Sequence, residues 1–145
     1  MRVVIGSDHA GLRLKEALKK SLIERGHEVE DVGTDANDPV DYPDFAVAVG
    51  RAVVDKGGLG VLICGTGIGV SIAANKIPGV RAARCDEPYS AKMARAHNDA
   101  NVLCMGERVV GQGVADMTMR AFLETPFEGG RHAGRVAKIV ALDRK

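Results

Sequence analysis

Short apolar runs alternate with amphipathic segments along the whole chain. The runs at residues 2–6 and 59–63 are almost unbroken, as in strands that are buried on both faces of a sheet. Residues 27–33 instead alternate polar and apolar positions, which is typical of a half-exposed edge strand. Further short strands are predicted at residues 80–83 and 102–106. The pattern therefore predicts five strands.

Segments with apolar positions at helical spacing separate these strands. Leu14, Leu18 and Leu22 share one face of the first helix. Lys15 is among the charged positions that the pattern assigns to its outer face. Asp44 is the predicted N-cap of the second helix. Further helices are predicted directly after the glycines at residues 65–69, at residues 87–97 and 113–123, and from about residue 131.

The alternation of strands and helices predicts an α/β fold with a parallel sheet. We expect a single domain over residues 1–145, a Rossmann-like three-layer sandwich with a central five-stranded parallel sheet and helices on both faces. In such folds ligands bind beyond the carboxyl ends of the strands. The residues that follow each predicted strand are therefore the first candidates for a functional site.

The composition narrows the class of protein. Its net charge is +1, from 20 Lys and Arg against 19 Asp and Glu, so it lacks the basic excess of a nucleic-acid surface. No apolar run approaches the roughly 20 residues that span a bilayer, and the first run is too short for a signal peptide. Three cysteines without close spacing do not form a disulfide framework. We expect a cytoplasmic protein that binds neither nucleic acid nor membrane.

The stretch after the strand at residues 59–63 carries the strongest chemical signal. Gly65, Gly67 and Gly69 occupy alternate positions in a loop that leads from this strand into a helix. Glycine lets the main chain approach a ligand closely, and the free N–H groups at the start of a helix favour an anion. Cys64 begins this loop, where nearby N–H groups favour the thiolate form. The stretch predicts an anion or oxyanion site with a reactive thiol.

Two other interpretations of this region are weaker. A dinucleotide-binding loop has the pattern G-x-G-x-x-G, but Val70 stands at its third glycine, although Asp86 lies where a ribose-binding acid would be. A zinc site formed by Cys64, Cys85 and Cys104 is conceivable because all three end strands. They lack the paired spacing of zinc ligands, however. Cys85 and Cys104 are interpreted as buried packing residues.

Polar residues near other strands extend the candidate site. Asp8 and His9 follow the first strand, where they either cap the first helix or contact a ligand. His97 and Asn98 end a predicted helix. There His97 either interacts with the helix dipole or exchanges a proton with a group near the thiolate.

Basic residues near the end of the chain suggest an anion ligand. Arg131 and Arg135 are four positions apart and project from one face of the last predicted helix. A solvated basic face is the ordinary interpretation of such a pair. The two glycines before them, together with Arg108 in another loop, favour a phosphate clamp.

Ordered blocks of residues form a specific signature along almost the whole chain. The blocks are Gly6-Ser7-Asp8-His9-Ala10-Gly11, Asp41-Tyr42-Pro43, Cys64-Gly65-Thr66-Gly67-Ile68-Gly69, Ser71-Ile72-Ala73-Ala74-Asn75-Lys76, Glu87-Pro88-Tyr89-Ser90-Ala91, His97-Asn98-Asp99, Arg108-Val109-Val110-Gly111, and Glu128-Gly129-Gly130-Arg131-His132 with Arg135. In these blocks the sequence resembles ribose-5-phosphate isomerase type B, in the family that also contains the galactose-6-phosphate isomerase subunits. The resemblance extends from about residue 3 to residue 140.

The resemblance implies an aldose–ketose isomerase of the pentose phosphate pathway that uses no metal or other cofactor. It would interconvert D-ribose 5-phosphate and D-ribulose 5-phosphate through a cis-enediolate. Cys64 is implied as the base, and Thr66 or His97 assists opening of the sugar ring, with Asp8 nearby. The substrate-binding residues that it implies are Asp8, His9, Tyr42, Gly65, Thr66, Gly67, Ile68, Gly69, Ser71, Asn98, Arg108, Arg131 and Arg135.

Within this set the resemblance implies different roles. The amides of residues 65–69 would stabilise the enediolate oxygen, and Asn98 and Tyr42 would contact sugar hydroxyls. The phosphate would be held by His9, Arg108, Arg131 and Arg135. One branch of the family has a Glu at the position of Val70 and lacks the cysteine. This chain therefore resembles the cysteine branch.

The family also implies a homodimer or homotetramer whose active sites draw residues from two subunits. His97, Asn98 and Arg108 are then expected to serve the Cys64 of a neighbouring subunit. The helix from about residue 131 is expected to take part in phosphate binding and subunit contact. Two other functions stay open. One is isomerisation of six-carbon sugar phosphates such as allose 6-phosphate or galactose 6-phosphate, and the other is a non-catalytic module that binds a nucleotide or a phosphosugar.

Overall fold

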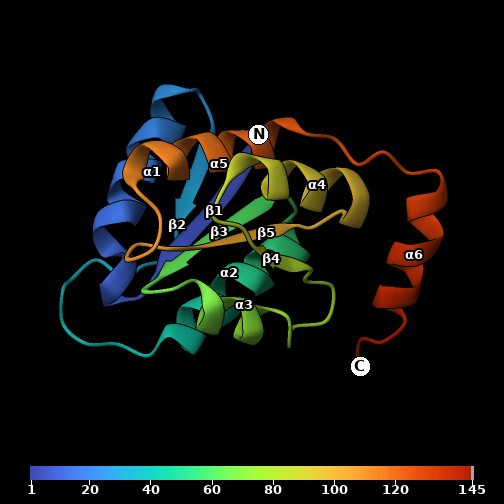
Figure 1. Ribbon diagram of the computed structural model, residues 1–145. Helices are drawn as coiled ribbons and strands as arrows, with labels where there is room; N and C mark the ends of the chain where they lie inside the picture. Colours follow the sequence, from blue (N-terminus) through green and yellow to red (C-terminus); the bar gives the residue numbers. More distant parts are fainter. Residues whose placement is uncertain (145) are drawn as a thin grey trace.

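A computed structural model describes residues 1–144 and contains a central sheet of five parallel strands (Figure 1). The order of the strands across the sheet is β2-β1-β3-β5-β4, and every neighbouring pair is parallel. The strands are β1 (Arg2–Ser7), β2 (Glu28–Asp31), β3 (Leu59–Cys64), β4 (Ala82–Arg84) and β5 (Val102–Gly106). The predicted α/β fold with a five-stranded parallel sheet is confirmed.

Helices connect the strands and cover both faces of the sheet (Figure 1). On one face lie α1, α4 and α5, and on the other lie α2 and α3. The helical segments are η1 (His9–Gly11), α1 (Leu12–Glu24), α2 (Tyr42–Lys56), α3 (Ile68–Ala74), α4 (Pro88–Asn98), α5 (Gln112–Glu124) and α6 (Arg131–Val140). No helix in the described residues is long and apolar enough to cross a membrane.

The central strands send alternate side chains into two hydrophobic cores. On β3, Val61 and Ile63 pack into the core beneath α1, α4 and α5. Leu62 and Cys64 pack into the core beneath α2 and α3. Because neither face of this strand meets water, its sequence is an almost unbroken apolar run rather than an alternating one. The carboxyl end of β3, where Cys64 lies, is thereby fixed between two packed layers.

Helix α6 lies outside these layers, at one end of the molecule (Figure 1). It contacts α4, and its buried residues are His132 and Val136. The segment that follows it is held where the Gly79 N–H donates to Asp143 Oδ2, at 2.8 Å. Ile139 and Val140 stay exposed. One apolar face of this helix is therefore left open by the described chain.

Two local predictions are wrong. Helix α2 begins at Tyr42 with Asp41 at the N-cap, so Asp44 lies in its first turn instead of capping it. Pro43 explains the earlier start, because its fixed φ suits the first turn of a helix. Lys15 is fully buried, because its Nζ donates to both carboxylate oxygens of Asp31, at 2.8 and 2.7 Å.

Candidate active site

The loop between β3 and α3 is folded around the sulfur of Cys64. The Gly67 N–H donates to Cys64 Sγ at 3.1 Å, and the Cys64 side chain is almost fully buried. Gly67 has a φ of 79°, and a Cβ at this position would lie 2.8 Å from the carbonyl carbon of Met105. Only glycine meets both conditions without strain. The loop therefore brings a backbone N–H donor to the sulfur of Cys64.

Cys64 lines an open cavity of about 490 Å³ at the carboxyl edge of the sheet, which we call the Cys64 pocket. Residues from the ends of β1, β3 and β5 and from the starts of α2 and α3 meet there. The pocket is lined by Asp8, His9, Ala10, Tyr42, Cys64, Gly65, Thr66, Ile68, Gly69, Ile72 and Arg108. Most of the predicted site residues in the first half of the chain are thus gathered in one place.

Asp8 and His9 are fixed by the backbone around them. Asp8 Oδ1 accepts from the Gly11 N–H at 3.1 Å and so caps η1, which means that this residue both caps a helix and lines the pocket. His9 Nδ1 accepts from the Val40 N–H at 3.1 Å. A neutral imidazole that accepts at Nδ1 carries its proton on Nε2. His9 can therefore donate from Nε2 to a ligand.

Arg108 and Tyr42 lie directly on the glycine loop. A Cβ at Gly65 would come within 3.1 Å of Arg108 Nη1, and one at Gly69 within 2.7 Å of the Tyr42 ring. The backbone of this arginine is fixed because its N–H donates to the Gly65 carbonyl at 3.1 Å. In the described chain Arg108 therefore lines the pocket of its own Cys64 rather than pointing away toward a neighbour.

Glu107 is a structural residue of this site that the sequence analysis missed. Its N–H donates to the Cys64 carbonyl at 2.9 Å, and its Oε1 accepts from the Leu14 N–H at 2.7 Å. It thus joins the loop after β5 to both β3 and the start of α1. No local pattern signals this role, because the partners lie far apart in the sequence.

Two hydroxyl groups of the predicted site form hydrogen bonds with the backbone of the glycine loop and of α3. Thr66 Oγ1 accepts from the Ile68 N–H at 3.2 Å, and the residue is exposed to solvent. Ser71 Oγ donates to the Ile68 carbonyl at 2.7 Å, within α3. Thr66 lines the Cys64 pocket, whereas Ser71 and Gly67 are not among its lining residues.

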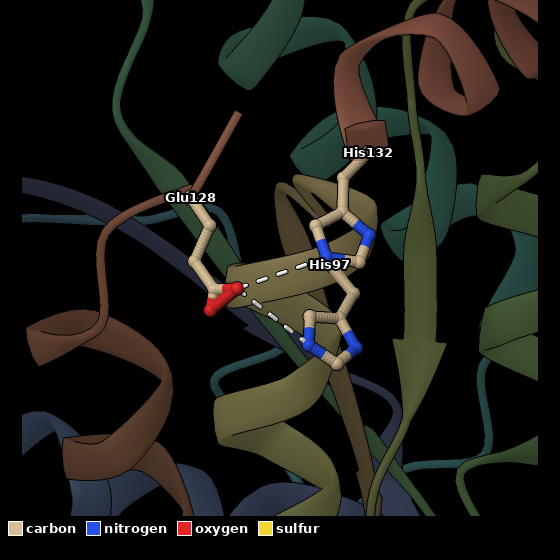
Figure 2. Close-up of side chains that lie close together, drawn as sticks. All are labelled: His97, Glu128 and His132. Carbon is tan, nitrogen blue, oxygen red and sulfur yellow. Dashed lines mark ion pairs between the residues drawn. The ribbon is translucent and has the colours of Figure 1, made fainter. Parts of the chain in front are cut away.

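A second group of predicted residues lies elsewhere, near α4 and α6. His97, at the end of α4, stacks on His132 with ring centroids 4.2 Å apart, and both face Glu128 (Figure 2). We call His97, Glu128 and His132 the histidine cluster. Asn98 lines a different hollow, and Arg131 and Arg135 are exposed on α6. None of these predicted residues lines the Cys64 pocket of the described chain.

His132 was not predicted as a site residue, although it stands beside Arg131 in one of the signature blocks. It is buried, and its pKa lies below the usual value. Burial is the main cause, followed by the charges of His97 and Arg131. Its imidazole is therefore held largely in the neutral form at neutral pH.

The other two cysteines are packing residues, as predicted. Burial, with smaller effects from Glu87 and Asp86, raises the pKa of the Cys85 thiol to about 11. Burial also raises the pKa of Cys104, which is fully enclosed in the core. Asp86, the acid considered for a ribose, pairs with Arg84 at 2.9 Å. Neither thiol is suited to act as a base at neutral pH.

Comparisons with known proteins agree with this geometry. The Ribose/Galactose Isomerase family model matches residues 3–139. Ribose-5-phosphate isomerase B of Escherichia coli is 49% identical, over 99% of this chain and 97% of the relative. The solved structure of the Clostridium thermocellum ribose-5-phosphate isomerase B has 52% identity and a TM-score of 0.96, covering 98% of this chain and 97% of that one.

A further solved structure is described with a ligand. The Mycoplasma genitalium ribose-5-phosphate isomerase B, solved with bound ribulose-5-phosphate, is 43% identical with a TM-score of 0.93. The match covers 97% of this chain and 94% of that chain. The resemblance found in the signature blocks is confirmed across nearly the whole sequence. The chain therefore belongs to the ribose/galactose isomerase family.

Proposed function

We propose that this chain is an aldose–ketose isomerase that interconverts D-ribose 5-phosphate and D-ribulose 5-phosphate, with Cys64 as the base. The observation that carries the proposal is Cys64 itself, a thiol in the wall of an open pocket that accepts an N–H donor at 3.1 Å. The names of the Escherichia coli and Clostridium thermocellum relatives support the same substrate. The reaction would serve the pentose phosphate pathway in the cytoplasm.

The proposed reaction is a proton transfer between two neighbouring carbons. The Cys64 thiolate removes the proton from C2 of the open-chain aldose, and the C–H bonding pair becomes the double bond of a cis-enediolate as O1 gains the negative charge. The same thiol then returns the proton to C1, while the O2 hydroxyl proton passes to O1, so that O2 becomes the carbonyl of the ketose and O1 its hydroxyl. The amides of residues 65–69 stabilise the charge on the enediolate oxygen. No step requires a metal or another cofactor.

The phosphate is assigned to residues of two chains. His9, through its Nε2 proton, and Arg108, against Gly65, supply donors from the same chain. Arg131 and Arg135 of a second copy would complete the clamp. Binding of this remote group would hold C1 and C2 against the sulfur.

We further propose that two copies share each site, in a homodimer or homotetramer. The support is the separation of the predicted residues, because His97, Asn98, Arg131 and Arg135 lie away from the Cys64 pocket of their own chain. In the wall of that pocket, Ile68 and Ile72 of α3 are 48% and 59% exposed. A second copy packed on this apolar face could bring its α4 and α6 residues to the thiol.

The remaining site residues take roles around the sugar. Thr66 of the same chain or His97 of the second copy assists ring opening, with Asp8 nearby. Tyr42 and the second copy's Asn98 contact the sugar hydroxyls. Gly65, Gly67, Ile68, Gly69 and Ser71 shape the loop and the first turn of α3 that face the substrate.

A second candidate substrate is a six-carbon sugar phosphate. The family includes galactose isomerases by its description, and the Cys64 pocket is open to solvent. An additional carbon between the reacting end and the phosphate would need only a slightly longer pocket. A non-catalytic phosphosugar- or nucleotide-binding module is the third candidate, and the Cys64 thiol in the pocket wall argues against it because binding alone needs no proton acceptor.

The test is turnover of ribose 5-phosphate, allose 6-phosphate and galactose 6-phosphate by metal-free protein. Cys64→Ala should lower kcat for the preferred substrate by about 10²- to 10⁴-fold, the usual contribution of a positioned base. Cys85→Ala is the matched control, because it removes a buried thiol outside the pocket. Turnover of a hexose phosphate alone would replace ribose 5-phosphate as the proposed substrate. Near-wild-type activity of Cys64→Ala would exclude Cys64 as the base.

A further inference from the structure

The histidine cluster joins three segments that are separate in the sequence. His97 lies in the last turn of α4, Glu128 lies in the connection before α6, and His132 lies in the first turn of α6 (Figure 2). The frame around it is fixed by backbone hydrogen bonds, because the Glu128 N–H donates to the Ala96 carbonyl and the His132 N–H to the Gly129 carbonyl, both at 3.0 Å. The backbone that carries Glu128 and His132 is therefore held in place by hydrogen bonds.

The polar atoms of the cluster converge without bonding to one another. Glu128 Oε1 lies 3.8 Å from His97 Nε2 and 3.7 Å from His132 Nε2. Both distances are too long for hydrogen bonds. One ligand atom of each residue lies within 4.8 Å of the other two. Tetrahedral bonds of about 2.0–2.1 Å place neighbouring ligand atoms about 3.3–3.4 Å apart, so the side chains must close by up to about 1.5 Å to hold a metal.

We propose that the histidine cluster binds one divalent transition-metal ion of the zinc class. Two imidazoles and one carboxylate are the donor set of open zinc sites, in which a fourth position is left for water or another ligand. The two rings are stacked at an interplanar angle of 12°, so binding requires one ring to turn toward the carboxylate oxygen. The His97 side chain is 39% exposed and Glu128 is 54% exposed, which leaves room for this adjustment.

The surrounding charges set the strength and the consequence of binding. Arg131 flanks His132 and Arg135 lies one turn further along α6, so positive charge opposes a dication and we expect weaker binding than at a structural zinc site. The bound ion would tie the end of α4 to α6 and occupy His97. If His97 assists catalysis, a consequence that rests on the proposed function, the ion inhibits the isomerase.

The binding test uses untagged protein carrying Cys64→Ser, so that the pocket thiol does not compete for metal. Co²⁺ titration followed by visible absorption, with Zn²⁺ competition, should give one ion per chain. Glu128→Gln should weaken binding by at least about tenfold, since loss of even an outer ligand partner costs that much. Glu124→Gln, which removes an exposed carboxylate of α5, is the matched control and should bind normally. Absent binding, or binding that Glu128→Gln does not weaken, would overturn the proposal.

The inhibition test uses the wild-type enzyme with added Zn²⁺. Turnover should fall and recover when a chelator is added, and Glu128→Gln should resist the inhibition compared with its own metal-free rate. Equal inhibition of both proteins would place the inhibitory ion outside the histidine cluster and contradict a role for the cluster. Since the cobalt titration needs no substrate, its result stands even if the protein proves not to be an isomerase.

Discussion

The Cys64 pocket and the histidine cluster differ in what holds their residues in place. The pocket is built on the ends of three neighbouring strands, and backbone hydrogen bonds from Gly67, Glu107 and Arg108 fix its loop. The cluster depends on partly exposed side chains and on α6, which lies outside the layers (Figure 1). The proposed base, which needs a fixed N–H donor, thus lies at the edge of the sheet. The residues that a second chain could use lie on α6 and at the end of α4.

The largest effect should come from adding a single methyl group to the glycine loop. Gly67→Ala would force a side chain into the left-handed region and within 2.8 Å of the Met105 backbone. We expect a loss of about 2–5 kcal/mol in the free energy of unfolding, from backbone strain and overpacking together. Urea denaturation measures this.

Gly113→Ala is the matched control for that change. Its Cβ would meet no atom within 4 Å, and Gly113 lies in the first turn of α5. Stability should stay level or rise by about 0.5–1 kcal/mol. Equal destabilisation by both substitutions would contradict the view that close approach of the backbone shapes the Cys64 loop.

An intermediate effect, on the KM for the sugar phosphate, is expected from a substitution in α6. Arg135→Ala should raise KM for the sugar phosphate by about 10- to 100-fold, because a charge-assisted hydrogen bond to the phosphate is lost. The folded state should be unaffected, since Arg135 is exposed. Lys138→Ala removes another exposed positive charge of α6 and should leave KM nearly unchanged. Similar KM values for both variants and wild type would remove Arg135 from the clamp.

The smallest effect concerns the buried ion pair that joins α1 to β2. Although burial would raise the pKa of Asp31, hydrogen bonds from Lys15, the Gly33 N–H and Lys19 outweigh it and lower this pKa. The resulting stabilisation is present above the unfolded-state pKa of about 3.9 and is lost as the pH falls through the lower folded-state pKa. Between neutral pH and about pH 3, the wild-type Tm should therefore fall further than that of Asp31→Asn.

Asp35→Asn is the control for the acid experiment. Asp35 lies 3.8 Å from Lys15, but its side chain is 89% exposed, so its charge is screened by water. Its acid-induced drop in Tm should match that of the wild type. If the acid-induced drop in Tm of Asp31→Asn also matches that of the wild type, the ion pair between Lys15 and Asp31 contributes nothing to stability above the pKa of Asp31.

The sequence predicted best what depends on local pattern. The β3 run and the glycines after Cys64 lie within a few residues of one another, so their structure and chemistry could be derived together. The prediction that Lys15 lies on the outer face of α1 is wrong because helical periodicity does not reveal its partner Asp31, which lies 16 residues away on β2. Asp44 was misassigned as the cap because Pro43 permits an earlier start.

The parts that sequence patterns could not supply depend on long-range contacts. Glu107 acts through Leu14, 93 positions away, and His132 meets His97 only because α6 folds back onto α4. The strongly amphipathic pattern of α6 correctly predicted a helix but not its place outside the layers. An apolar face can be recognised in a sequence, whereas the surface that covers it can lie in another chain.

The most direct test of the account is complementation between two inactive chains. One carries Cys64→Ala, and the other carries both His97→Asn and Arg135→Ala. If each site combines the Cys64 pocket of one chain with the α4–α6 residues of another, one of the two sites in a mixed dimer is intact. Co-expression should then restore about a quarter of wild-type activity for random pairing.

The control pairs Cys64→Ala with Arg108→Ala, two residues of the same pocket, and should give no gain over the separate parents. Recovery with the first pair and none with the second is the result that the account predicts. Activity of the first mixture that stays at the average of its parents would contradict a Cys64 site completed by a second copy.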